Sequence, residues 1–248
     1  MTEIDVKKKT EEIIKKLVKL PYSEIFQISP IERDLTNLHL EHPSIPEPLL
    51  GMMFCSIMLG NKQNAINVAN KIWNTESKLP DVLEMLYSDC LINIGEFEKA
   101  QILINSKMDN VQKYLNMFYG TLVKYALFTG NIYILNNLAN DPEIYITEPP
   151  LFDFAAKYYE GINNKHYNAI LKIIYDTVGD FICTIEYLIN TEGTMQLCLY
   201  TTANTEENTN LQKLIYEKIN GYYLSMQEDT QNDISVSLQN INLHPAWW

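Results

Sequence analysis

The sequence contains few of the residues from which catalytic and metal sites are most often built. Four cysteines and four histidines are spread over 248 residues, and the cysteines form neither a CxxC pair nor another ligand spacing. There is no glycine-rich phosphate loop, no GxSxG motif and no HExxH motif. These absences favour a protein with no catalytic site, no cofactor and no metal ion.

Two pairs of these residues nevertheless have a regular spacing. His39 and His42 lie three residues apart, but Pro43 follows them and no third ligand is near in the sequence, so we do not expect a metal site there. Cys55 and Cys90 are 35 residues apart, and each precedes a glycine by five residues. Equivalent repeat positions predict buried packing residues rather than a disulfide or a metal site.

Long apolar runs are also missing. The stretch from Leu49 to Leu59 has 11 residues, which is too short to span a bilayer. The N-terminus has no continuous apolar segment of the kind found in secretory signals, and its four acidic residues argue against a mitochondrial presequence. We therefore expect a cytoplasmic protein with no membrane span.

Positive charge is scarce beyond the first 19 residues. These carry six lysines and four acids, a net charge of +2, whereas the whole chain carries −12, so the remainder carries −14. An acidic body of this kind repels phosphate backbones. Nucleic acid is therefore not an expected partner.

The main feature that the sequence does contain is a repeat. A glycine or asparagine, followed five residues later by an alanine or leucine, recurs at intervals of 35, 35 and 34 residues: Gly60/Ala65, Gly95/Ala100, Gly130/Leu135 and Asn164/Ala169. An apolar stretch precedes each turn and an amphipathic run follows it. Glycine and asparagine adopt the left-handed conformation that ends a helix. A fixed period of this length predicts stacked pairs of helices.

Between Pro48 and about Gly179 the chain resembles the tetratricopeptide-repeat (TPR) family. The resemblance rests on the repeat length, the turn glycine and the following alanine, as in Gly60 to Ala65 and Gly95 to Ala100. The chain departs from the family where a small residue is usual in the first helix, and has instead Met53, Ser88, Val123 and Lys157. It departs again at the second alanine of the pattern, which is replaced by Ile72, Lys107, Pro142 and Asp176. The resemblance implies a right-handed α-solenoid of about four helix pairs, with a concave face that holds a peptide or a partner helix.

We divide the chain into an N-terminal segment (1–47), the repeats (48–179) and a C-terminal region (180–248). In the first part, the pattern predicts a lysine-rich amphipathic helix over residues 4–20 and a second, short helix over residues 30–40. The first helix either caps the repeats, as its i,i+4 Glu and Lys pairs suggest, or lies on an acidic membrane surface.

After Gly179 the apolar pattern alternates, which predicts strands. The turn chemistry of Asn190 to Gly193 and the apolar faces select one hairpin register, with the pairs Ile189/Met195, Tyr187/Leu197 and Ile185/Leu199. A helix from Leu211 to Met226 and a third strand within 233–243 follow. The prediction is an α+β region with a small antiparallel sheet, which is either an independent domain or a cap on the repeats.

The inward face of the first helices is the predicted partner-binding surface. If the TPR resemblance holds, this face carries Leu50, Phe54, Ile57, Met85, Asp89, Asn93, Lys124, Phe128, Phe154 and Tyr158. Because this set is mostly apolar and aromatic, we expect an amphipathic helix or an extended apolar segment as the ligand, not a carboxylate tail. The alternative is that the chain's own N-terminal helix or C-terminal region fills this face.

Two tryptophans, Trp247 and Trp248, end the chain. They either lie along the protein's own surface as a latch, or dock on a partner or on a second copy of the chain as a homodimer. Taken together, these features predict a mainly α, non-enzymatic scaffold or adaptor for protein–protein interaction. The alternatives are an intracellular chaperone for one specific partner, and an enzyme or regulator with its site in the C-terminal α+β region.

Overall fold

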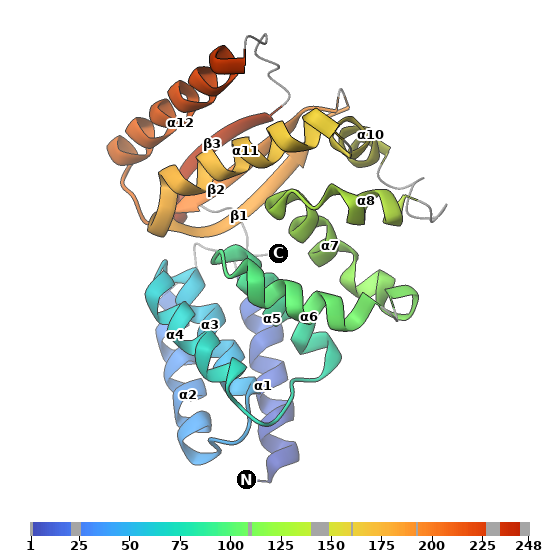
Figure 1. The fold of residues 1–248 in the computed structure, drawn as a ribbon. Helices are drawn as coiled ribbons and strands as arrows, with labels where there is room; N and C mark the ends of the chain where they lie inside the picture. Colours follow the sequence, from blue (N-terminus) through green and yellow to red (C-terminus); the bar gives the residue numbers. More distant parts are fainter. Residues whose placement is uncertain are drawn as a thin grey trace.

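The structure is a computed structural model that describes residues 2–20, 26–108, 111–139, 149–159, 161–191, 193–226 and 234–243. It is mainly helical, with a three-stranded sheet built from the C-terminal part of the chain. Figure 1 shows helices α1 to α6 in the lower half and the sheet with α11 and α12 in the upper half. None of the described helices is both long enough and apolar enough to cross a membrane.

The N-terminal part forms three helices, α1 (Glu3–Val18), α2 (Ile28–Glu41) and α3 (Glu47–Met58). A capping box starts α1: the Asp5 amide donates to the Thr2 hydroxyl, and the Thr2 amide donates to the Asp5 carboxylate. The apolar stripe of α1, which includes Ile14 and Leu17, is buried, and α1 contacts both α2 and α3. The two helices predicted in this part are confirmed.

In the described part of the chain, four helix pairs can be recognised in chain order, the first beginning with α3. They are α3 with α4 (Lys62–Trp73), α5 (Asp81–Asn93) with α6 (Phe97–Met108), α7 (Val111–Thr129) with α8 (Ile132–Leu138), and α10 (Pro149–Tyr158) with α11 (Gly161–Val178). The predicted turns at Gly60, Gly95 and Gly130 are confirmed, since their φ angles are 68°, 84° and 70°. Ala65 and Ala100 are fully buried, as expected where two helices approach closely.

The predicted fourth turn was wrong. The chain turns at Gly161, which has a φ of 72°, and Asn164 lies inside α11. Glycine adopts a positive φ at lower cost than asparagine, so the turn forms at the glycine and the last interval shortens to 31 residues. The fifth residue after this turn is His166, which is buried, whereas Ala169 is only partly buried.

Strands β1 (Ile182–Ile189), β2 (Met195–Thr201) and β3 (Ile234–Asn240) form a sheet in the order β1-β2-β3. The predicted hairpin register is confirmed at all three pairs. Strand β3, however, pairs with β2 in the parallel direction, so the prediction of an antiparallel sheet was wrong. Helix α12 (Thr205–Met226) carries the chain back to the starting end of β2 before β3 begins, and such a crossover produces parallel strands.

Helix α12 begins six residues earlier than predicted. Asn204 and Glu207 form a reciprocal cap, in which the Glu207 amide donates to the Asn204 side chain and the Asn204 amide donates to the Glu207 carboxylate. This cap makes the polar stretch before Leu211 helical.

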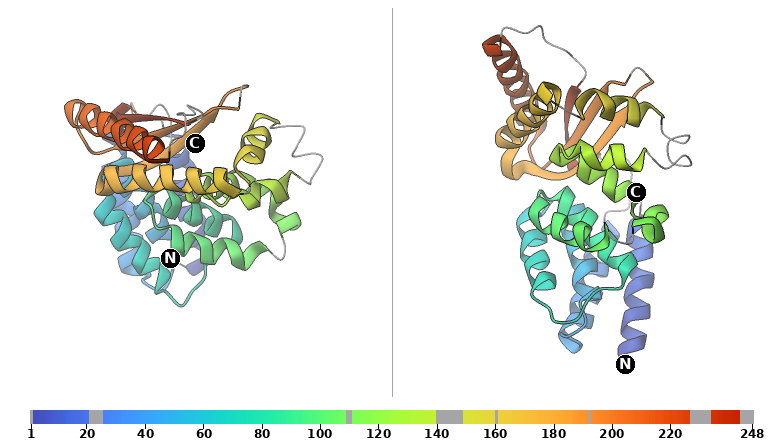
Figure 2. Two further views of the ribbon diagram at one scale, coloured as in Figure 1. Left: turned by 45° about the horizontal axis from the view of Figure 1, so that its top comes forward. Right: turned by 45° about the vertical axis from the view of Figure 1, so that its right-hand side comes forward.

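Helices and sheet share one hydrophobic core. The two views of Figure 2 show α11 and α12 beside the strands, and the lower helices beneath them. Strand β1 contacts α3, α5 and α10, so the C-terminal region packs directly on the helix pairs. The boundaries at residues 47 and 179 stay predictions.

Candidate functional site

Most of the predicted binding face is inside the core. Phe54, Phe128, Phe154 and Tyr158 are 2%, 1%, 0% and 5% exposed, and Asn93 is 1% exposed. Leu50 and Ile57 are buried as well. The expectation that these side chains face an open groove was wrong, because other parts of the chain cover them.

Three aromatic contacts show how these rings are buried. The Phe128 ring meets the Tyr187 ring of β1 edge to face, with the ring centres 6.1 Å apart. The Phe154 ring packs against Tyr158 and Tyr167, at 5.0 and 5.8 Å. The C-terminal region therefore covers part of this face, as in the alternative considered above.

Three of the predicted residues, Met85, Asp89 and Lys124, do line an accessible groove. Two adjoining cavities, of about 390 and 290 Å³, share Met85 and Leu86 and follow one face of α5. We name this feature the α5 groove. Its lining is Glu11, Ile14, Lys15 and Lys19 of α1 and its end, Pro80 just before α5, Val82, Leu83, Met85, Leu86 and Asp89 of α5, Gly120, Thr121 and Lys124 of α7, and Tyr187 of β1.

The groove exists because of how its helices pack. α1 packs on α3, and α5 packs on α3 and α7, so α1 and α7 stand on either side of α5. Val82, Met85, Leu86 and Asp89 occupy positions i, i+3, i+4 and i+7, which form one face of a helix. Val82 is 53% exposed, and Met85 and Leu86 are partly exposed. This face of α5 is thus only partly covered.

One end of the groove holds a buried ion pair. Lys124 Nζ lies 3.2 Å from Asp89 Oδ2, and Asp89 is 4% exposed. Burial raises the pKa of the Asp89 carboxyl above its usual value, while the charge and hydrogen bond of Lys124 pull this pKa down. The two residues are 35 positions apart and hold equivalent places in successive helix pairs.

The other end of the groove is basic. Lys15 and Lys19 are exposed beside the apolar side chains of Ile14, Val82 and Leu83, and Glu11 is partly exposed. On a chain with a net charge of −12, this end has the opposite sign to the body. The groove therefore combines a basic end, an apolar middle and an internally paired polar end.

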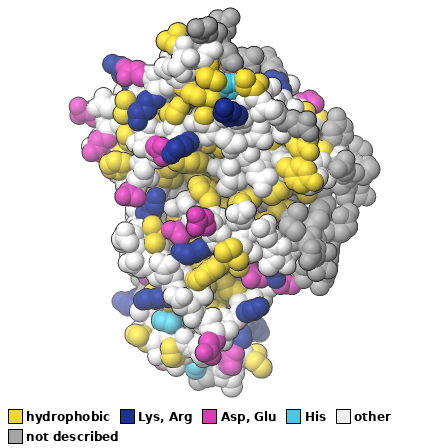
Figure 3. All heavy atoms as spheres, in the orientation of Figure 1, with side chains coloured by type: hydrophobic (Ala, Val, Ile, Leu, Met, Phe, Trp, Pro, Cys, Tyr) yellow, Lys and Arg dark blue, Asp and Glu magenta, His cyan; other side chains and the backbone are white. Residues whose placement is uncertain are grey.

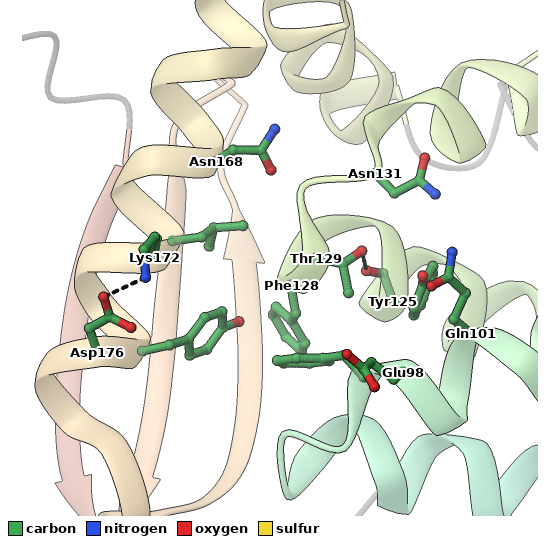
Figure 4. A pocket seen from close by; sticks show the side chains of 12 residues that line it. Glu98, Gln101, Tyr125, Phe128, Thr129, Asn131, Asn168, Lys172 and Asp176 are labelled. Atoms are coloured by element: carbon green, nitrogen blue, oxygen red, sulfur yellow. Dashed lines mark hydrogen bonds and ion pairs between the residues drawn. The ribbon is translucent and has the colours of Figure 1, made fainter.

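A second cleft, of about 590 Å³, lies between α11 on one side and α6 and α7 on the other. Figure 4 shows Asn168, Lys172 and Asp176 on the α11 wall, facing Glu98, Gln101, Tyr125 and Thr129. Phe97 of α6 and Tyr175 of α11 approach across the cleft, with ring centres 5.4 Å apart. No signal for this cleft is visible in the sequence, because its walls come from helix pairs that are far apart in the chain.

Several polar groups of this second cleft are engaged with each other or with the backbone. Lys172 Nζ lies 2.8 Å from Asp176 Oδ2, and the Thr129 hydroxyl donates to the Tyr125 carbonyl. Burial raises the pKa of Tyr175, so its hydroxyl stays protonated at neutral pH. A hydroxyl that donates to a carbonyl is not activated by a neighbouring base. The arrangement suits binding of a polar group better than nucleophilic chemistry.

The other candidates from the sequence carry no site among the described residues. The four cysteines are free thiols, and burial raises the pKa of Cys55 and Cys90, which makes them unreactive. Within the described ranges, no group of three or more His, Cys, Asp and Glu side chains is placed to hold a metal ion. Trp247 and Trp248 lie outside the described residues.

The visible face offers no single dominant hydrophobic patch. In Figure 3, hydrophobic side chains appear in separate groups among charged and uncharged polar side chains. Comparison with known proteins gives no match: no family model fits the chain, and no curated protein or solved structure is significantly similar to it. The α5 groove and the second cleft are therefore the basis for a functional proposal.

Proposed function

We propose that this protein is a non-enzymatic interaction module, a TPR-like right-handed α-solenoid that binds a helical segment of a partner protein in the α5 groove. The observation that carries the proposal is the partly covered face of α5, where Val82, Met85 and Leu86 lie between two flanking helices. Helix-in-groove recognition uses apolar anchors at helical spacing on an amphipathic segment. We also propose that the protein is cytoplasmic.

The chemistry of the groove defines the partner segment. Its apolar residues would pack on Met85 and Leu86, over the two turns of α5 from residue 82 to residue 89. An acidic residue at one end would face Lys15 and Lys19, which are the exposed cations of the lining. Because Asp89 and Lys124 already neutralise each other, the far end favours an uncharged polar residue. A chaperone for one specific partner would use the same groove.

The experiment compares two matched substitutions. Val82→Asp places a charge in the groove, and Ile102→Asp places the same charge on α6, outside the groove lining; the two side chains are 53% and 57% exposed. Neither should unfold the chain, since both sites are surface positions. Peptides that bind the natural chain are selected from a displayed library of amphipathic helices, and their affinities for all three proteins are measured by calorimetry.

We expect Val82→Asp to weaken binding at least about tenfold, which corresponds to about 1.4 kcal/mol, and Ile102→Asp to leave binding unchanged. A Lys15→Ala/Lys19→Ala variant should weaken peptides with an acidic end more than peptides with a neutral end. Equal affinity for the natural chain and the Val82→Asp variant would rule out the α5 groove as the binding site.

A further inference from the structure

The outer edge of strand β3 is occupied by side chains rather than by another strand. β3 pairs with β2 on one side. On its other side, the Gln212 amide Nε2 donates to the Val236 carbonyl at 3.0 Å, and the Leu238 amide donates to Gln212 Oε1 at 3.4 Å. The Tyr216 hydroxyl lies 3.2 Å from both the nitrogen and the oxygen of Val236. Both side chains belong to α12.

This pattern reproduces the hydrogen bonds of a neighbouring strand. In a parallel ladder, the N–H and C=O of one residue bind a carbonyl and an amide that lie two residues apart on the next strand. The Gln212 carboxamide binds the Val236 carbonyl and the Leu238 amide in this way. It therefore takes the place of the N–H and C=O of one residue of a fourth, parallel strand, opposite Ser237.

The two side chains are held in position by the packing of α12. Gln212 and Tyr216 are four residues apart, so they project from one face of the helix. Between and after them, Ile215 and Ile219 are 0% and 8% exposed and anchor α12 to the core. Figure 1 shows α12 beside the sheet on the side of β3. The contact is thus a fixed feature of the fold.

Without this contact, β3 would be a typical pairing edge. Its side chains alternate between apolar (Ile234, Val236, Leu238) and small polar (Ser235, Ser237), and it contains no proline and no charge. An edge of this composition is a template for another strand unless something blocks it.

We propose that Gln212 and Tyr216 close the β3 edge against strand addition, and that the strand they exclude is β3 of a second copy of this chain. Two copies present the same outward groups of Val236 and Leu238, so an antiparallel pair across a two-fold axis satisfies both edges at once. Wherever this chain is made, other copies of it are also present, and each copy carries the same β3 strand.

The test removes the four hydrogen bonds and keeps the side-chain bulk. The variant is Gln212→Leu/Tyr216→Phe, and the control is Lys213→Ala/Glu217→Ala, which removes an exposed ion pair from the same turns of α12. Sedimentation equilibrium over a range of concentrations gives the association state. Amide hydrogen exchange at Val236 and Leu238 reports the edge itself, and circular dichroism checks that each variant, including both single substitutions, is folded.

At low concentration, we expect these two amides to exchange about tenfold faster in the double variant, the effect of losing one hydrogen bond each. As the concentration rises, the double variant should show one association step that the natural chain and the control lack, and the two amides should regain protection. Adding Ser235→Lys, which places a charge on the edge strand, should abolish that step.

The proposal fails if the folded double variant has the same association state as the natural chain at every concentration. It also fails if association occurs but persists with Ser235→Lys and leaves Val236 and Leu238 unprotected, since the contact would then lie elsewhere. If the double variant does not fold, the association state and the amide exchange of the two single variants test the proposal in the same way.

Discussion

The buried pair of Asp89 and Lys124 gives the sharpest prediction. Lys124→Met keeps most of the side-chain bulk but removes the charge that lies 3.2 Å from Asp89 Oδ2. At an effective dielectric constant of about 20, two unit charges at this distance attract each other by about 5 kcal/mol. Breaking one side of a buried pair typically costs about 3–5 kcal/mol, because the remaining charge stays buried. We therefore expect the free energy of unfolding to fall by about 3 kcal/mol at pH 8.

The loss should depend on pH. Burial raises the pKa of Asp89 above its usual value of 3.8, and Lys124 opposes this rise, so the pKa in the variant is higher still. A folded-state pKa above the unfolded one contributes stability that is fully present below the unfolded pKa and disappears as pH rises through the folded pKa. The penalty of Lys124→Met should therefore grow as pH rises from the folded-state pKa of Asp89 in the natural chain to its higher folded-state pKa in the variant, by up to about 1.4 kcal/mol per pH unit.

Urea unfolding at pH 5 and pH 8 measures this directly for the natural chain, Lys124→Met and Asp89→Asn/Lys124→Met. The double variant has no carboxyl at this site, so the extra pH dependence should vanish. A penalty below about 1 kcal/mol at pH 8 would match an exposed ion pair. That result, or an equal penalty at both pH values, would refute the reasoning that Asp89 is a buried charge held by Lys124.

The other predictions concern stability and use the same urea assay. Gly95→Ala should cost about 1–2 kcal/mol, because Gly95 has a φ of 84° although no atom lies near the added Cβ. Gly221→Ala, at an exposed position in the interior of α12 with equally open space, should instead stabilise by about 0.5–1 kcal/mol; the same sign for both would contradict the role of the φ angle. Ala100→Leu should cost about 1–3 kcal/mol by overpacking a fully buried site, and an unchanged stability would mean that the helices there do not pack closely. Burial raises the pKa of the Glu47 carboxyl, so the contribution of Glu47 to stability is lost as pH rises. Relative to the natural chain, Glu47→Gln should therefore become more stable towards pH 8. Parallel pH profiles for the two proteins would count against the burial of Glu47.

The sequence alone determined the features that depend on short stretches of chain. The hairpin register follows from a turn and two flanking alternations within residues 182–201, and the structure reproduces it. The turns at Gly60, Gly95 and Gly130 follow from the low cost of a positive φ at glycine. The signal for the earlier start of α12 is also in the sequence, because Asn204 and Glu207 have the spacing of a capping box. In each case the deciding contacts lie within a few residues.

Only the tertiary structure decided which surfaces stay open. Leu50 and Met85 are 35 residues apart and equivalent in the repeat, yet Leu50 is fully buried while Met85 lines the α5 groove. The difference arises because α1 packs on α3, the helix of Leu50, whereas the Met85 face of α5 lies in the groove between α1 and α7. The parallel direction of β3, and its closure by Gln212 and Tyr216, likewise depend on where α12 lies. Periodicity shows that a helix or strand has an apolar face, but the segment that covers this face is chosen by contacts between distant parts of the chain.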